Sequence, residues 1–432
     1  MNKSRVLYNK VVLVVIFFAV CIQSVFSQSS PLSPYSRFGI GDIAIGQSPR
    51  NMAMGGVSTA LVSNRNISVF NPASFLNLDS NAVIFEISFN VHLSQIKQKI
   101  GEEILKSNSN AAALSSVTFN FPILNNYLAA GIGLQPVASI DYNVNRIIPS
   151  DGTNGEHLLT NSGSGGLGKA YFGIAGGYKY FSLGAKANYI FGSTTRLAEL
   201  SIADTLLFPY ATTTRMKNYL TANGFSIDFG FQYKQPIGNR FLLGLGASYT
   251  PQYNIFVERK YALFSEGLNY LDTIVDESGK KGKIVMPQFY TVGISFEELG
   301  KWVISSEYRY HYFSQYKEYD NHDPNLTDAR SVHFGAELIG DRIAKNYFSR
   351  MFYRFGATYG TNYVAYNQNV RNQWSVALGF GFPIKTNYSR IDVTFEYGQN
   401  GDIKKGQIQE DFGRISIGFF GFERWFYRRK FN

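Results

Sequence analysis

Few residues in this 432-residue chain have the types and spacing that chemistry needs. The segment Gly163–Ala170 has the glycine and lysine spacing of a phosphate-binding loop, but Ala170 stands where such a loop needs a Ser or Thr hydroxyl to hold Mg²⁺. An alternating, strand-like pattern follows it, whereas a phosphate-binding loop opens a helix. The sequence therefore predicts a flexible loop at this point and no nucleotide site.

A second candidate is a group of imidazoles and carboxylates around one polar stretch. His311, Asp320, His322 and Asp323 are the side-chain types that hold cations. A solvated loop has the same composition, so we expect no metal at these residues and no bound cofactor. The chain also lacks the Gly-x-Ser-x-Gly elbow that presents a nucleophilic serine.

Composition excludes several classes of protein. Hydrophobic residues make up 45% of the chain and aromatic residues 16%, far too much apolar surface for a disordered protein. A single Cys excludes a disulfide scaffold. The one apolar run, Val11–Ile22, is shorter than the roughly 20 residues of a membrane-spanning helix.

The first residues predict export from the cytoplasm. Lys3, Arg5 and Lys10 precede the apolar run, and Val25-Phe26-Ser27 resembles a cleavage site. We expect residues 1–27 to form a signal peptide.

From Val83 onward, apolar and polar residues alternate strictly. Val83, Phe85, Ile87, Phe89 and Val91 are separated by polar residues, which is typical of a strand with one apolar face. Fourteen such runs occur, near residues 82–92, 115–122, 126–134, 169–180, 181–191, 222–234, 240–250, 287–296, 301–312, 330–340, 350–359, 373–382, 388–398 and 412–421. The pattern predicts an all-β protein with an antiparallel sheet.

The links between these runs alternate in length. Every second link has at most about ten residues, and the others have roughly 13 to 36. Three short links share a proline next to an isoleucine, at Pro122, Pro236 and Pro383, and proline marks strand ends and turns. Tight turns at one end and long loops at the other are typical of outer membrane barrels. Residues 81–432 are therefore predicted to form a 14-stranded transmembrane β-barrel with seven long extracellular loops, located in the cell outer membrane.

The two faces of the predicted strands agree with a barrel in lipid. About five apolar residues per strand in fourteen strands are too many for one water-excluded core. The opposite face carries glycines and unlike charges such as Glu307, Arg309 and Arg390, which suit a wet lumen. His92 and His333 fall on this polar face, away from any lipid substrate, so we expect no enzymatic activity.

A fourteen-stranded barrel is wider than its own side chains fill, so another part of the chain is expected inside it. Residues 28–80 precede the first strand. Within them, Arg50–Ala60 contains Met-Gly-Gly, and Val69–Ser74 contains Asn-Pro-Ala. These two motifs resemble the N-terminal segment of the FadL-like outer membrane proteins, although many members have Gly where this chain has Ser74. The resemblance implies that residues 28–80 form a hatch in the lumen, with gating residues Gly55, Gly56, Asn71, Pro72 and Ala73.

In FadL-like transporters, a hydrophobic ligand leaves sideways through a gap in the wall. A gap needs a broken strand, and the third run contains Gly131 and Gly133 and leads into Pro136. We therefore predict a lateral kink at these three residues.

Two functions fit this resemblance. The first is passive uptake of small hydrophobic molecules through a hatch-gated lumen. The second is a non-transporting accessory or plug subunit of a type IX secretion translocon, for which long loops such as 251–286 offer surface. The expected partners are outer membrane lipids and, during biogenesis, the barrel-assembly machinery, whose recognition signal the aromatic last strand resembles. The basic run 423–432 is assigned to these partners, because nucleic acid does not reach the outer membrane.

Overall fold

The fold is described from a computed structural model of the chain. It describes residues 33–44, 46–64, 68–79, 81–149, 156–202, 212–267, 270–366, 369–384 and 389–425. The predicted signal peptide and residues 426–432 of the basic run lie outside these ranges. Within them, no helix is long and apolar enough to cross a membrane.

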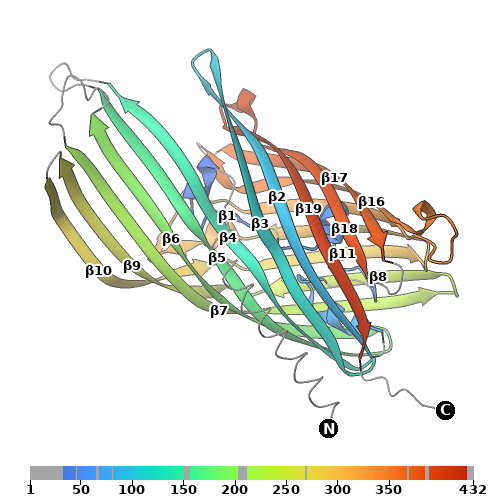
Figure 1. Cartoon of the computed structure of the whole chain (residues 1–432). Helices are drawn as coiled ribbons and strands as arrows, with labels where there is room; N and C mark the ends of the chain where they lie inside the picture. Colours follow the sequence, from blue (N-terminus) through green and yellow to red (C-terminus); the bar gives the residue numbers. More distant parts are fainter. Residues whose placement is uncertain are drawn as a thin grey trace, which may run out of the picture.

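The wall is one antiparallel sheet that closes on itself, because β19 pairs with β2 (Figure 1). Its strands are β2 (Ala82–Ile100), β3 (Glu103–Leu124), β4 (Leu128–Ile148), β5 (His157–Tyr178), β6 (Phe181–Ile202), β7 (Thr213–Ile237), β8 (Phe241–Thr250), β9 (Tyr253–Gly267), β10 (Tyr270–Met286), β11 (Phe289–Glu298), β12 (Trp302–His311), β15 (Ala329–Leu338), β16 (Phe352–Tyr366), β17 (Asn369–Pro383), β18 (Arg390–Asn400) and β19 (Gln409–Arg424). The short strands β13 (Lys317–Glu318) and β14 (Asn321–His322) form a hairpin between β12 and β15.

We call each strand position around the wall a stave. In two cases a single stave consists of two strands that are separated by a proline. β8 and β9 both pair with β7 and are separated by Pro251 and Gln252. β10 and β11 are separated by Pro287 and Gln288. Proline has no N–H to donate to the ladder, so pairing stops at each of these positions. The wall therefore has fourteen staves, which confirms the predicted barrel.

The staves are longer than the sequence predicts, and the long loops are shorter. β2 runs to Ile100 and β3 begins at Glu103, although a long loop was expected between them. The expected loop 251–286 forms β9 and β10, and Gly163–Ala170 lies within β5. These loop predictions were wrong, because alternation reports which faces are apolar. Outside the apolar belt, strands with polar side chains still pair through their backbones.

The faces of the wall are inverted relative to a soluble protein. Along β7, Phe225 is 70% exposed and Phe229 is 47% exposed, whereas their neighbours Asp228 and Gln232 are buried. Such a pattern places apolar side chains toward lipid and polar ones toward the interior.

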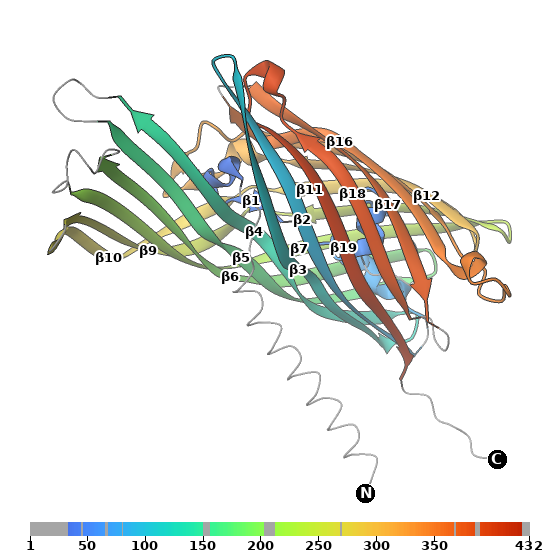
Figure 2. The ribbon, with the colours of Figure 1, turned by 45° about the horizontal axis from the view of Figure 1, so that its top comes forward.

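The described residues between 33 and 79 lie inside the barrel, and we name them the lumenal segment (Figure 2). This segment contains η1 (Pro34–Arg37), β1 (Asp42–Ile43), α2 (Pro49–Ala53) and η2 (Pro72–Asn77). η1 contacts β4, α2 contacts β16 to β19, and η2 contacts β3 to β7 on the facing wall. The segment therefore crosses from one side of the lumen to the other.

We call the end of the barrel with the tight turns at 125–127, 179–180 and 238–240 the turn end, and the opposite end the far end. η2 lies toward the turn end, whereas Tyr35 of η1 contacts Ile408 at the far end. On one side of the barrel β4 to β7, β9 and β10 extend well past their neighbours at the far end (Figures 1 and 2).

Candidate functional site

The Asn-Pro-Ala motif fixes the lumenal segment near the turn end. Asn71 is the N-cap of η2: its Oδ1 accepts from Ala73 N at 3.1 Å, and Pro72 occupies the first turn. Its Nδ2 donates to Thr59 O at 2.8 Å and to Phe231 O of β7 at 3.0 Å. The backbone comes so close to β7 that a Cβ on Gly230 would lie 2.7 Å from Pro72 Cδ. These predicted hatch residues therefore join the segment to itself and to the wall.

The two predicted glycines of the Met-Gly-Gly motif are held on the opposite wall. Gly55 and Gly56 have φ values of +66° and +87°, and a Cβ on Gly55 would lie 2.6 Å from Phe334 O. Gly55 O accepts from Thr358 Oγ1 at 2.9 Å and lies 2.6 Å from His333 Nδ1. Gly56 O accepts from Gln47 Nε2 and from Arg309.

Buried ion pairs reinforce this attachment. Arg50 Nε of α2 donates to Glu337 Oε2 at 2.8 Å. Arg354 bridges Glu337, at 3.3 Å, and Asp392, at 2.7 Å, and Arg390 also pairs with Asp392 at 2.8 Å. All of these side chains are buried. Because a buried charge without its partner is costly, the network resists any movement of α2 out of the lumen.

Two further contacts join wall charges to the backbone of the segment. Glu307 Oε2 accepts from Ser58 N and Thr59 N, both at 2.8 Å. Lys186 pairs with Asp228 at 2.9 Å and donates to Val69 O at 2.5 Å. The lumen-facing charges were predicted to line a wet lumen, and at this level that prediction was wrong. They pair with one another and with the lumenal segment.

Nearer the far end, the wall parts between β3 and β4. Their pairing runs from Leu124 and Leu128 to Val117 and Leu134 and then stops. Just beyond this point β3 has an extra residue at Ser115, opposite β2, and β4 has one at Val137, opposite β5. Such bulges bend strands and end pairing. We name this break the seam.

The predicted kink residues lie at different places relative to the seam. Gly131 and Gly133 are still paired with β3, opposite Asn120 and Thr118. Pro136 lies at the seam, next to the bulge.

The lumenal segment covers the seam from inside. Asp42 and Ile43 pair with Ser139 and Ala138 of β4, and Ala44 N donates to Val137 O at 3.0 Å. Ser115 Oγ of β3 donates to Gln47 O at 2.9 Å, and Gln135 of β4 donates to Gly46 O. We name residues 42–44 with 46 and 47 the strap, since they join both sides of the seam. Burial raises the pKa of Asp42, although the charge of Arg371 opposes the shift.

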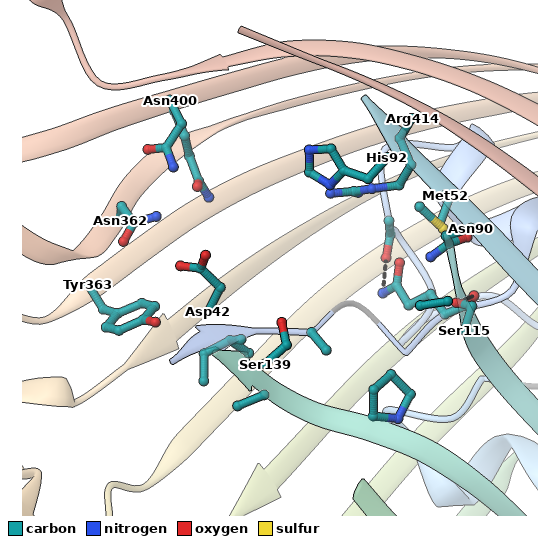
Figure 3. A pocket seen from close by; sticks show the side chains of 18 of the residues that line it. Asp42, Met52, Asn90, His92, Ser115, Ser139, Asn362, Tyr363, Asn400 and Arg414 are labelled. Atoms are coloured by element: carbon teal, nitrogen blue, oxygen red, sulfur yellow. Dashed lines mark hydrogen bonds between the residues drawn. The ribbon is translucent and has the colours of Figure 1, made fainter. Parts of the chain in front are cut away.

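A cavity of about 480 Å³ lies between the strap, α2 and the wall (Figure 3). Both sides of the seam line it, through Ser115 of β3 and Pro136 and Ser139 of β4. Its other walls combine aromatic rings with polar side chains, among them His92, Asn400 and Arg414. Its size is that of a small-ligand site, about 300–1,000 Å³.

The residues considered for a cation site do not come together. His311 lies in β12 and stacks on Phe289 at 3.9 Å between ring centroids, whereas Asp320 pairs with Lys283 at 3.4 Å. Among the described residues, no three His, Cys, Asp or Glu side chains are grouped in a way that would hold a metal ion.

A protein family and several solved structures match this chain. The BamG family model matches residues 8–432. The chain belongs to the BamG family. No curated protein matches its sequence.

Solved structures of FadL-like barrels have the same fold as this BamG-family chain. The CymD monoaromatic hydrocarbon channel is 13% identical, with a TM-score of 0.58 over 90% of this chain and 100% of that one. A FadL homologue of Pseudomonas aeruginosa is 12% identical, with a TM-score of 0.58 over 88% and 98%. The toluene transporter TodX of Pseudomonas putida is 14% identical, with a TM-score of 0.58 over 90% and 100%. The resemblance predicted from the Met-Gly-Gly and Asn-Pro-Ala motifs is confirmed at the level of the fold.

Proposed function

We propose that this chain is an outer membrane barrel that conducts no solute and serves as an accessory subunit of a barrel-assembly machinery. The observation that carries the proposal is the lumenal segment, which buried ion pairs and backbone hydrogen bonds hold against facing walls. The family name BamG begins with Bam, the abbreviation of the barrel-assembly machinery. This name favours an accessory role in barrel assembly over one in type IX secretion. The proposal includes no enzymatic activity.

The chemistry of the lumen supports this assignment. A path for hydrophobic molecules needs apolar walls, because a ligand without hydrogen bonds would strip water from polar groups and leave them unpaired. Across α2, the interior carries Arg50, Glu337, Arg354 and Asp392, all paired and buried. Opening the lumen at α2 would separate ion pairs that are buried away from water.

The outer surface supplies area for a partner. The long extensions of β4 to β7, β9 and β10 carry polar residues beyond the apolar belt (Figure 1). A stable protein interface buries about 1,200–2,000 Å² in total, so such a partner would have to contact several of these strands.

Passive uptake of small hydrophobic molecules is the second candidate, and one observation favours it. The cavity reaches the seam between β3 and β4, where Pro136 and the two bulges end the pairing of the wall. In that case the hatch would consist of the strap and of residues Gly55, Gly56, Asn71, Pro72 and Ala73. The seam would be the exit into lipid.

Purification of the intact chain from native outer membranes in mild detergent separates the two candidates. The accessory role predicts that barrel-assembly components accompany the chain in fixed proportion. Their absence, together with a hydrophobic molecule bound to the chain and slower uptake of that molecule after gene deletion, would establish uptake instead.

A further inference from the structure

One aromatic ring lies between polar side chains on the inner face of the last strand. Residues Glu410, Phe412, Arg414 and Ser416 alternate along β19 toward the lumen, and Phe412 is the aromatic one among them. Its register partner on β18 is Gly398, and a Cβ at that glycine would lie 2.6 Å from Phe412 Cζ. The ring therefore lies over bare backbone and lines the cavity as an apolar platform.

Planar polar side chains flank this ring on both sides. The backbone register places His92, Arg414 and Glu396 in one row across β2, β19 and β18. It places Glu410, Asn400 and Gln373 in a second row across β19, β18 and β17. We name these six side chains and Phe412 the platform site.

The charges of the first row are largely satisfied. Arg414 Nη1 pairs with Glu396 Oε2 at 2.9 Å, and its guanidinium lies 5.4 Å from the centre of the Phe412 ring. The His92 ring lies 5.5 Å from the same ring, with Nε2 at 3.7 Å from Glu410 Oε1. Two carboxylates face one guanidinium, so the site does not favour an anion.

Other polar atoms near the cavity lack a hydrogen-bond partner among the described residues. Asn400 Oδ1, His92 Nε2 and the nearby Asn90 Oδ1 are buried and have no hydrogen-bond partner among the described residues. Figure 3 shows these side chains around the cavity. A purely hydrocarbon ligand would offer no hydrogen bonds to the polar side chains that line the cavity, and each polar group left without a partner costs about 1–3 kcal/mol.

We propose that the platform site binds a neutral saccharide ring. A pyranose has an apolar C–H face, which would stack on Phe412, and a rim of hydroxyls that both donate and accept hydrogen bonds. Asn400, Glu410 and Glu396 supply acceptors to that rim, and Arg414 and His92 supply donors. The cavity volume suits a ligand of this size.

This inference does not depend on the accessory role, since the site lies in the lumen and the proposed docking surface lies outside. The same ring chemistry occurs in a free sugar and in the carbohydrate part of an outer membrane glycolipid. The seam would offer the second source a way in from the membrane once the strap leaves it.

Titration calorimetry on the full-length mature chain tests the proposal. The protein is kept in a polyoxyethylene detergent, because maltoside detergents carry a competing disaccharide. The probes are glucose, maltose, N-acetylglucosamine and lipid-free core oligosaccharide from lipopolysaccharide. We expect saturable binding of at least one probe, and the stronger probe identifies the source as free sugar or glycolipid.

Two phenylalanine variants make the test specific. Phe412→Ala should weaken binding at least tenfold, whereas Phe395→Ala, on the lipid-facing side of β18 and 49% exposed, should leave it unchanged. Asn400→Ala should weaken it severalfold. Heat-dependent migration in gel electrophoresis verifies that each barrel has folded. Absence of binding by every probe, equal losses in both phenylalanine variants, or tighter binding of choline than of any sugar would overturn the proposal.

Discussion

The two ends of the lumenal segment are attached to the wall in different ways. From Arg50 to Asn71 the segment meets buried charges and a capped turn, with partners on both sides of the lumen. From Asp42 to Gln47, the strap is held by backbone pairing with β4 and by hydrogen bonds across the seam. Removing one partner of a buried ion pair costs several times more than losing one hydrogen bond. We therefore call the strongly held part, from Arg50 to Asn71, the locked level, and the weakly held strap the yielding level.

The largest expected effect comes from the locked level. Glu337→Gln removes the carboxylate that Arg50 and Arg354 share, and should lower the free energy of unfolding by about 3–5 kcal/mol. Thermal unfolding in detergent measures the loss, and trypsin should cleave the lumenal segment faster. Glu258→Gln, an exposed change on β9, is the matched control and should have no effect. Equal melting temperatures for the two variants would show that the network is not the lock.

A smaller loss is expected at the Met-Gly-Gly motif. Gly55→Ala combines positive φ with a clash against β15 and β16 and should destabilise the barrel by about 2 kcal/mol or more. Gly238→Ala has a similar φ, +60°, but nothing within 4 Å of the new Cβ. It should lose only about 1 kcal/mol. Chemical denaturation gives both values, and an equal loss would exclude close packing at Gly55.

A still smaller effect is expected at the strap. Ser115→Ala removes one hydrogen bond to Gln47 and should lower stability by about 0.5–1.5 kcal/mol. Amide exchange should increase at residues 42–47 and stay unchanged at residues 50–60. Faster exchange throughout the segment would mean that its two ends are not independent. The exposed Ser107→Ala on β3 serves as the control.

The pH should act on the strap through Asp42. Burial raises the pKa of Asp42 in the folded chain, so the folded state holds this proton more tightly than the unfolded state. The resulting stabilisation is present below the ordinary range of an aspartate, about pH 4, and is lost as pH rises through the folded pKa. Amide protection of the strap should therefore fall between acidic and neutral pH, and Asp42→Asn should abolish this dependence. An unchanged profile in that variant would assign the titration to another group.

Sequence alone predicts the barrel well, for a physical reason. Lipid contact forces apolar residues onto every second position, and the fourteen runs follow from that constraint. The lengths of the staves do not follow, because the polar ends of β2, β3, β9 and β10 pair through backbone groups that carry no side-chain pattern.

The candidate site was predictable in part. The Met-Gly-Gly and Asn-Pro-Ala motifs mark places where the backbone must turn or pack closely, so Gly55 and Asn71 are visible in the sequence. The role of Arg50 is not, because Glu337 lies 287 positions away. A single arginine within a stretch of small residues was the available signal. Phe412 has no signal beyond its position on the polar face of the last strand.

A disulfide between the lumenal segment and the wall tests the central claim most directly. A Cβ on Gly293 of β11 would lie 3.3 Å from Ala60 Cβ, close to the spacing of bonded cysteines, about 3.5–4.5 Å. The sole Cys of the chain, Cys21, lies in the predicted signal peptide, so Ala60→Cys with Gly293→Cys would add the one pair to the exported chain. A closed accessory barrel predicts that this oxidised variant, as the only copy in its host, supports normal outer membrane protein assembly. Loss of function that a reductant restores would contradict the account and show that the segment must move.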